Sequence, residues 1–296
     1  MIQQLSILIP TRNDACLNQV EALQTMASKI DGLQYEIIVS DDNSTDPEAI
    51  KQNEIIATME NCRVIHRTEN LGRAANRNFL ARNARFDWLL FLDCNVKINN
   101  GKFLKNYLEQ DKFDVVNGGI IAETDKQLAK HNLRYQYEKS VEQKHVASKR
   151  QQRPYKSFRT SNFMVRRDVM LAKPLDETVS GYGYEDVLWG KTLYNNRLTI
   201  NHIDNSVAIT HFESNTTYVA KVEEAMHTLH TLRHDLIGYS PLLAKVESLR
   251  KKHLISLYLM LYKPFAKCIR KNLIGDKPQI KLLNFYKLGY YLCIKD

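Results

Sequence analysis

The chain has 296 residues, of which 44% are hydrophobic and 25% charged, a composition typical of a globular protein with a sizeable buried core. Its 11 Gly and 7 Pro are too few for a fibrous or disordered chain. The five Cys form no CxxC pair, which argues against a disulfide framework or a cysteine-based zinc site and favours a reducing compartment.

The formal net charge of +9 belongs to the C-terminal tail. Residues 244–296 hold 12 Lys and Arg against 3 Asp and Glu, whereas residues 1–243 carry 30 of each sign. The larger part is therefore not a general polyanion binder, and we expect no nucleic acid among the partners. With no secretory signal at the start and no apolar stretch of the ~20 residues that a spanning helix needs, we expect a cytoplasmic location.

The first half of the sequence alternates strand and helix patterns. Strands are predicted at residues 5–9, 35–39, 63–66, 88–92 and 114–116. Helices are predicted at residues 15–29 with Asn13 or Asp14 as the cap, from Asp46-Pro47 onward, and at about 73–83. This order predicts an α/β fold with a Rossmann-like, mostly parallel sheet flanked by helices.

The second half is less regular. Residues 123–153 are polar and predicted to be helical or mobile, residues 158–165 to form a strand, and residues 186–196 a helix. Residues 198–203 and 207–212 look like a pair of strands, and the pattern is helical from residue 218.

Polar clusters follow four successive strands of the first half. They are Thr11-Arg12-Asn13, Asp41-Asp42-Asn43, the stretch from Asn70 to Asn78, and Asp93-Cys94-Asn95. Each cluster alone is also typical of turns and helix caps. Because ligands of parallel sheets bind beyond the carboxyl ends of the strands, their order along one chain favours a binding site.

In that order the clusters resemble those of the family 2 glycosyltransferases, inverting enzymes of the GT-A fold. The matching segments are Pro10-Thr11-Arg12-Asn13, Asp41-Asp42-Asn43-Ser44-Thr45-Asp46, Asn70-Leu71-Gly72-Arg73-Ala74-Ala75-Asn76-Arg77-Asn78 and Asp93-Cys94-Asn95. Two residues depart from the pattern: Asn76 replaces the usual Ala, and Asn95 replaces the second Asp of D-x-D. The resemblance implies that a nucleotide sugar binds at Pro10, Thr11, Arg12, Asn13, Asp41, Asp42, Asn70, Gly72, Arg73, Arg77 and Asp93.

A second group of motifs lies further along the chain. Gly181-Tyr182-Gly183-Tyr184-Glu185-Asp186 matches a family segment that also occurs in related galactosyltransferases. The resemblance implies that Asp186 is the catalytic base and Glu185 contacts the acceptor, with Asn162, Tyr182, Gly183 and Tyr184 near the acceptor or sugar. Two carboxylates before a helix also stabilise its N-terminus, which is the structural alternative. Trp189 and His202 are read as structural residues.

A divalent cation fits the chemistry, because a leaving nucleoside diphosphate develops negative charge. Asp93, Asn95 and His211 are the candidate ligands, and His211 lies where many such enzymes place a metal-binding His. Carboxylate and amide oxygens suit Mg²⁺ or Mn²⁺, and an imidazole favours Mn²⁺. Since the Asn95 amide adds no charge, we expect either that metal affinity falls or that the site depends more on Asp93, His211 and the diphosphate itself.

The resemblance implies a hexosyltransferase-type inverting enzyme with a GT-A domain at 1–215 and a helical basic region at 216–296. Within the domain, about 1–121 would bind the donor and about 122–215 the acceptor. We expect a uridine nucleotide sugar and a glycan or lipid-linked acceptor in surface polysaccharide synthesis. A non-catalytic binding partner of such an enzyme is an alternative, motivated by Asn95. A sugar nucleotidyltransferase is less favoured, because no Gly-rich phosphate loop follows the first strand.

The basic tail has two alternative interpretations. Between residues 254 and 294, apolar and aromatic side chains interleave with Lys and Arg, a pattern that suits an anionic membrane surface. The same pattern is typical of helices packed against a domain with their lysines facing water. We expect a peripheral contact with the inner face of the cell membrane.

Overall fold

The computed structural model describes residues 1–179 and 181–295. The chain divides into two compact units. Unit 1 consists of Met1–Ile121, Lys144–Ser180 and Trp189–His211, and unit 2 of Ala122–Gln143, Gly181–Leu188 and Phe212–Asp296. Compact packing does not establish an independent domain, so the limits 1–215 and 216–296 stay a prediction.

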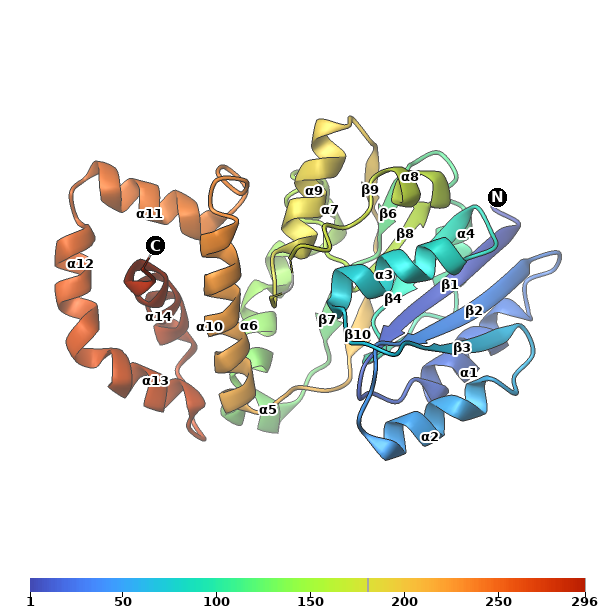
Figure 1. Cartoon of the computed structure of the whole chain (residues 1–296), viewed down its shortest axis with the longest axis horizontal. Coiled ribbons are helices and arrows are strands. Elements are labelled where there is room, and N and C mark those ends of the chain that lie inside the picture. Colours follow the sequence, from blue (N-terminus) through green and yellow to red (C-terminus); the bar gives the residue numbers. More distant parts are fainter. Residues whose placement is uncertain (180, 296) are drawn as a thin grey trace. The chain divides into compact units, whose positions relative to one another are not determined.

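Unit 1 is built on a seven-stranded sheet (Figure 1). Its order is β3 (Cys62–His66), β2 (Gln34–Asp41), β1 (Gln4–Thr11), β4 (Trp88–Leu92), β8 (Asn162–Arg166), β6 (Val115–Asn117) and β9 (Ile200–His202). The neighbours from β3 to β4 run parallel, β8 is antiparallel to both β4 and β6, and β9 is parallel to β6. The predicted α/β fold with a mostly parallel sheet is confirmed.

A smaller sheet contains β5 (Val96–Lys97), β10 (Val207–Ile209) and β7 (Ile120–Ala122). The two strands predicted at residues 198–203 and 207–212 are present, but they belong to different sheets. Strand β9 pairs with β6 in the large sheet, whereas β10 pairs antiparallel with β5. Between them, the Asn205 N–H donates to the Gly118 carbonyl, which directs the chain away from a hairpin.

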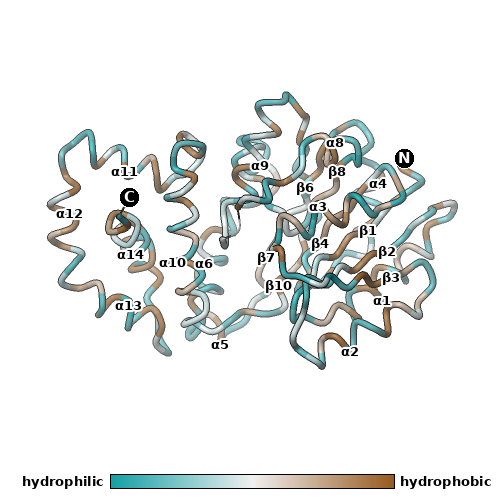
Figure 2. The backbone as a smooth tube through the Cα atoms, viewed as in Figure 1, coloured by the Kyte–Doolittle hydropathy of each residue, from teal (hydrophilic) through white to brown (hydrophobic). Residues whose placement is uncertain are grey.

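Helices cover the large sheet on both faces, because alternate residues of each strand point to opposite sides. Ile7 and Ile9 of β1 join one apolar cluster with α1 (Leu17–Ala27), α2 (Pro47–Ile56) and α4 (Phe103–Leu108). Leu8 joins the other cluster, with α3 (Gly72–Asn83), α8 (Arg167–Ala172) and Trp189 of α9 (Glu185–Asn195). The hydrophobic character of the central strands is visible in Figure 2. Unit 1 also contains α7 (Ala147–Gln151).

The helix starts differ in how they are capped. Asp46 caps α2 as predicted, accepting hydrogen bonds from the N–H groups of Glu48 and Ala49 at 2.9 and 3.2 Å. The predicted cap of α1 is wrong, because its N-cap residue is Cys16 and makes no side-chain cap. The Asn13 side chain binds the loop after β2 instead.

Unit 2 is helical. It contains α5 (Lys126–His131), α6 (Leu133–Val141), α10 (Asn215–Thr231), α11 (Pro241–Lys251), α12 (Ile255–Tyr262), α13 (Ala266–Ile274) and α14 (Ile280–Cys293), with short 3-10 turns at Glu142–Lys144 and Lys263–Phe265. Helices α10 to α13 surround α14 (Figure 1), whose buried Leu283, Tyr286, Leu288 and Tyr291 join the two apolar clusters of this unit. Among the helices of the described chain, none is long and apolar enough to cross a membrane.

Candidate active site

The carboxyl ends of the parallel strands bring the first polar clusters of unit 1 together. In the sheet register, Thr11 is paired with Asp41, and Asp41 with His66. Strand β4 is parallel to β1 and pairs Phe91 with Leu8, so Asp93 follows at the same edge. This is the edge at which open parallel sheets bind ligands.

Asn13 and Asp41 tie the loops after β1 and β2 to each other. Asn13 has a left-handed backbone (φ 58°), and its side-chain oxygen accepts from the N–H groups of Thr45 and Asp46 at 2.7 and 3.0 Å. The Asp41 carboxylate accepts from the N–H and hydroxyl of Ser44 and lies 3.2 Å from His66 Nδ1. These two polar side chains therefore shape the loops at the candidate nucleotide site.

Asp42 stabilises the start of α3. Its two carboxylate oxygens accept hydrogen bonds from the N–H groups of Leu71 and Gly72 at 3.2 and 2.8 Å. The negative charge of the carboxylate also interacts favourably with the positive end of the helix dipole. Gly72 has φ 88°, which costs a glycine little. Arg67 adds an ion pair to Asp42 at 3.1 Å.

Arg77 and Asp93 form an ion pair with 2.5 Å between Nη2 and Oδ1. Arg77 is buried in the middle of α3, whereas the Asp93 side chain is 30% exposed. The Asp93 carbonyl accepts from Gln19, and its N–H donates to Ser161. Arg77 Nε is buried and has no hydrogen-bond partner within the described part of the chain. A fixed cation thus faces a carboxylate that is partly exposed to solvent.

Asn76 ties α3 to β2. Its amide donates to the Ser40 carbonyl at 3.0 Å, and its side-chain oxygen is buried without a partner among residues 1–179 and 181–295. The substitution of the usual Ala therefore adds a link between this helix and the sheet edge.

The pairing of β5 with β10 brings His211 near the second half of the D-x-D-like motif. The Asn95 carbonyl accepts from the N–H and hydroxyl of Thr210, at 3.1 and 2.9 Å. Ile209 is paired with Val96 in the antiparallel register, and His211 directly follows Thr210 in the sequence. Asp93, Asn95 and His211 consequently come from adjoining backbone segments.

These residues suit a cation only in part. Asp93 already has Arg77 as a counterion, and Asn95 supplies a neutral oxygen. The Cys94 thiol stays protonated, because its hydrogen bond to the Cys16 thiol and its burial raise its pKa. No group of three or more His, Cys, Asp or Glu that could hold a metal occurs in the described residues. A cation here would depend on Asp93, His211, the Asn95 amide and oxygens of the ligand itself.

In unit 2, the segment Gly181–Asp186 lies against α10. The Tyr182 N–H donates to Glu224 at 2.8 Å, and a Cβ on Gly181 would lie 2.5 Å from the Thr228 hydroxyl. Gly183 and Tyr184 both have left-handed backbones, with φ 88° and 69°. That conformation is uncommon for a bulky residue and is a mark of functional segments.

Glu185 and Asp186 form the first turn of α9. Glu185 is 9% exposed, and Asp186 accepts from the Val187 N–H at 2.8 Å. Burial raises the pKa of the neighbouring Tyr184 hydroxyl. The Tyr184 ring packs against the apolar cluster of α10, α11 and α14.

Asn162 is a structural hub of unit 1. It is 1% exposed, accepts from the Tyr107 hydroxyl at 2.6 Å, and donates to the carbonyls of Gly119 and Asn205 at 2.9 Å each. Its polar atoms are satisfied by these contacts, so its geometry favours holding loops over binding a sugar. Trp189, 1% exposed, is a core residue as predicted.

Three residues at the sheet edge had no place in the sequence prediction: Gln19, His66 and Arg67. His66 could have been found, because it ends the predicted strand 63–66. Gln19 and Arg67 carry no motif, and only the folded chain brings them to Asp93 and Asp42.

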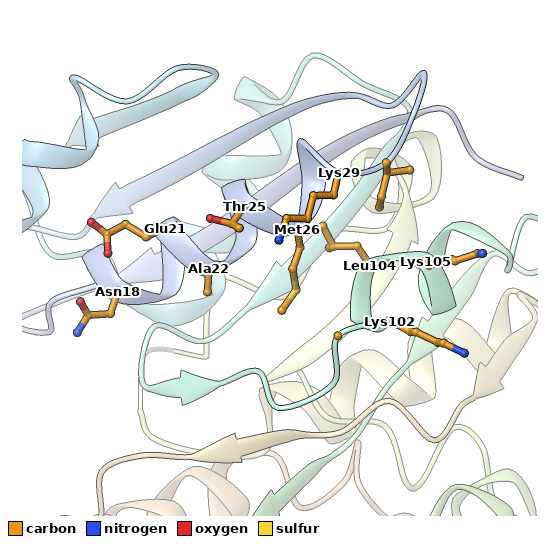
Figure 3. Close-up of a pocket in the computed structure, with 11 residues that line it drawn as sticks. Asn18, Glu21, Ala22, Thr25, Met26, Lys29, Lys102, Leu104 and Lys105 are labelled. Atoms are coloured by element: carbon orange, nitrogen blue, oxygen red, sulfur yellow. The ribbon is translucent and has the colours of Figure 1, made fainter.

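A shallow groove of about 650 Å³ lies elsewhere on unit 1 (Figure 3). It is formed by α1 and the start of α4, with Lys29, Lys102 and Lys105 around an apolar floor that includes Met26 and Leu104. None of the predicted site residues lines this groove, so it is not the site that the motifs indicate.

Comparison with known proteins decides the family. The family model described as "Glycosyl transferase family 2" matches residues 6–172, more than half of the chain. The chain belongs to glycosyl transferase family 2. The matched region includes the strand-end clusters of unit 1 described above, and the protein is a glycosyltransferase. No curated protein sequence gives a significant match.

Solved glycosyltransferase structures share the fold at low sequence identity. The mannosyltransferase PcManGT from Pyrobaculum calidifontis, in complex with GDP-Man and Mn²⁺, is 14% identical over 99% of this chain and 85% of its own, with a TM-score of 0.57. S. aureus TarS 1–349 with UDP is 17% identical over 98% and 88%, with a TM-score of 0.54. The same protein with UDP-GlcNAc is 14% identical over 98% of this chain and 88% of its own, with a TM-score of 0.52.

Proposed function

We propose that this protein is an inverting glycosyltransferase that transfers a sugar from a nucleotide-diphosphate sugar to a hydroxyl of a glycan or lipid-linked acceptor in surface polysaccharide synthesis. UDP is the favoured nucleotide. The observation that carries the proposal is the Arg77–Asp93 pair at the carboxyl edge of the sheet. Complexes of PcManGT with GDP-Man and of TarS with UDP-GlcNAc support a nucleotide-sugar donor.

In the proposed donor site, the loops that hold Pro10, Thr11, Arg12 and Asn13 and those with Asp41, Asp42 and Asn70 surround the nucleoside. Gly72 and Arg73 start the helix that carries Arg77. The Arg77 guanidinium would compensate the charge that develops on the leaving diphosphate. Because it is buried and held by Asp93, little reorganisation is needed when that charge appears.

Asp93, Asn95 and His211 would hold a divalent cation, with Mn²⁺ favoured over Mg²⁺ by the imidazole. A bound cation supplies further neutralisation of the diphosphate. The Mn²⁺ in the PcManGT complex supports this assignment. The neutral Asn95 and the Arg77 counterion of Asp93 lead us to expect weak cation binding without nucleotide.

On the acceptor side, Asp186 would take the proton from the attacking hydroxyl, and Glu185 would orient the acceptor. Tyr182, Gly183 and Tyr184 would line the approach of the sugar. Within unit 1, Asn162 would hold the loops at Gly119 and Asn205 in place. We also propose a peripheral position on the cytoplasmic face of the cell membrane, with the C-terminal region contacting anionic lipid.

A thermal-shift experiment tests the donor site. UDP, GDP, CDP and dTDP are each added with and without Mn²⁺ to the wild type, to Asp93→Ala and to the exposed control Asp31→Ala. We expect stabilisation by UDP with Mn²⁺ that Asp93→Ala loses and Asp31→Ala keeps. A ligand at about 100 times its dissociation constant stabilises by roughly 2.7 kcal/mol, which such a measurement detects.

Transfer from a radiolabelled UDP-sugar tests catalysis. Asp186→Asn should abolish transfer while leaving the UDP shift unchanged, because it removes the base and not the nucleotide site. Transfer that persists in Asp186→Asn would contradict the assigned base. A wild type that binds nucleotide but transfers no sugar would favour the non-catalytic binding partner, and a wild type that responds to no nucleotide would contradict the donor site.

A further inference from the structure

Helix α12 and the turn after it present an apolar surface to solvent. Five large hydrophobic side chains within twelve residues are between 37% and 63% exposed: Leu254, Leu257, Met260, Leu261 and Phe265. The other large exposed hydrophobic residues of the described chain are scattered, from Met1 to Ile237. Single exposed apolar residues are ordinary, whereas a contiguous group marks an interaction surface.

The opposite face of α12 is fixed within unit 2. Tyr262 is buried, and a Cβ on Gly289 of α14 would lie 2.2 Å from its ring. The Tyr258 hydroxyl donates to the Phe285 carbonyl at 2.8 Å. Because these contacts fix the inner face of α12, its other face points to solvent. We call this face the α12 apolar surface (Leu254, Leu257, Met260, Leu261 and Phe265). A helix against water normally carries charged residues on its outer face, but Ile255–Tyr262 contains none.

The charges along this segment of the chain are cationic. From residue 250 to residue 275 the sequence has seven cationic side chains and no acidic one: Arg250, Lys251, Lys252, Lys263, Lys267, Arg270 and Lys271. Arg250 and Arg270 form ion pairs with Glu247 and Glu223, so the lysines rather than the arginines supply the cationic character of this segment. Lys251 and Lys252 precede α12, and Lys263 and Lys267 follow it, all of them exposed. An apolar strip with lysines at both ends complements a bilayer that combines anionic headgroups with a hydrocarbon interior.

We infer that the α12 apolar surface is the element of this protein that inserts into an anionic lipid bilayer. Helix α12 lies along the interface, with its leucines and Met260 among the upper acyl chains and the flanking lysines at the headgroups. The aromatic and apolar residues of α13 and α14 that are buried, such as Leu273 and Tyr286, form the core of unit 2 and stay out of the bilayer. The inference rests on the proposed membrane contact and needs no assumption about the sugar transferred.

Vesicle co-sedimentation of the full-length chain tests it. Vesicles of phosphatidylcholine alone are compared with vesicles that also contain phosphatidylglycerol. The variant Leu257→Ser, Met260→Ser, Leu261→Ser is compared with the matched control Ile55→Ser, Val146→Ser, Leu171→Ser, whose three positions are exposed in unit 1. Far-UV circular dichroism and thermal melts check that both variants fold.

We expect the wild type and the control to bind the anionic vesicles and to be released by salt. The α12 variant should lose roughly tenfold or more in partitioning, given the apolar area that three side chains no longer bury. Equal binding by the α12 variant, or no binding by the wild type, would overturn the inference. So would a wild-type dimer in light scattering that becomes monomeric in the α12 variant without any vesicle binding, because the surface would then join two copies.

The thermal shift with UDP separates this inference from the proposed function. The α12 variant should keep the wild-type response to nucleotide even as it loses vesicle binding. If the donor-site proposal fails, no nucleotide response appears in any variant while vesicle binding persists.

Discussion

His202 is expected to make unit 1 sensitive to acid. It lies at the end of β9, is 6% exposed, and has both ring nitrogens engaged. Nε2 donates to the Pro154 carbonyl and Nδ1 accepts from Arg150, each at 2.9 Å. Protonation of Nδ1 would remove the acceptor for Arg150 and place a second cation beside the guanidinium.

Burial is the main cause that lowers the pKa of His202 from its ordinary value of 6.5 to about 4, with the nearby Arg150 charge contributing. Between these two pKa values, His202 binds a proton in the unfolded chain but not in the native chain. Its contribution to the free energy of unfolding is therefore fully present above about pH 6.5 and is lost as the pH falls towards 4. At 1.36 kcal/mol per pKa unit, the full effect is about 3 kcal/mol, and at pH 5 it is about 2 kcal/mol.

Urea unfolding of the wild type and of His202→Gln, at about pH 7 and about pH 5, measures this effect. The two tryptophans, Trp88 and Trp189, both lie in unit 1, so their fluorescence reports on that unit alone. Since carboxylates titrate in both proteins, the informative quantity is the difference in pH dependence. The wild type should lose about 2 kcal/mol more than the variant, and the exposed control His234→Gln should behave as the wild type. Equal losses in wild type and His202→Gln would refute the reasoning.

Three further substitutions test the packing and the site. Gly289→Ala would place a Cβ 2.2 Å from the Tyr262 ring. It should lower the free energy of unfolding of unit 2 by about 1–3 kcal/mol, which calorimetry detects. An unchanged unfolding transition would contradict the close approach of α12 and α14. Gly190→Ala would place a Cβ 2.2 Å from the Tyr155 carbonyl oxygen, and because backbone cannot move aside as a side chain can, we expect about 3 kcal/mol of destabilisation by urea titration. Asp42→Asn weakens the hydrogen bonds to the start of α3 and should cost about 1–3 kcal/mol together with a smaller UDP-induced thermal shift; a full UDP shift would remove Asp42 from the nucleotide site.

The parallel part of the sheet could be predicted because its strands are short buried runs with clear ends. Strand β4 was predicted at its observed bounds, residues 88–92, and β1 is longer than the predicted 5–9 by one residue at the start and two at the end. Pro10 directly follows the predicted strand but lies inside β1. Its missing N–H is tolerated because the other atoms of the run keep pairing with β2.

Two strands of the small sheet, β5 and β7, could not be predicted, because they are too short for a pattern. Strand β5 has two residues and β7 three, fewer than one full alternation requires. Likewise, the residues of β9 and β10 read as strands, but nothing in their sequence names the partner of each. The partner of each strand is set by where β5 and β6 lie in the folded protein, because β10 pairs with β5 and β9 with β6.

The motifs identify candidate site residues, but they do not tell which of them hold the loops in place and which are available to a ligand. The contacts in the structure distinguish the two groups. The side chains of Asn13, Asp41 and Asp42 accept hydrogen bonds from neighbouring loop groups. Substituting these residues should therefore change the shape of the loops at the site. Asp93 remains partly exposed, and its partner Arg77 has a buried Nε without a partner in the described residues. A diphosphate or cation arriving at this edge would therefore act first on the Arg77–Asp93 pair, because that ion pair contains the charges whose interactions a ligand could complete or replace.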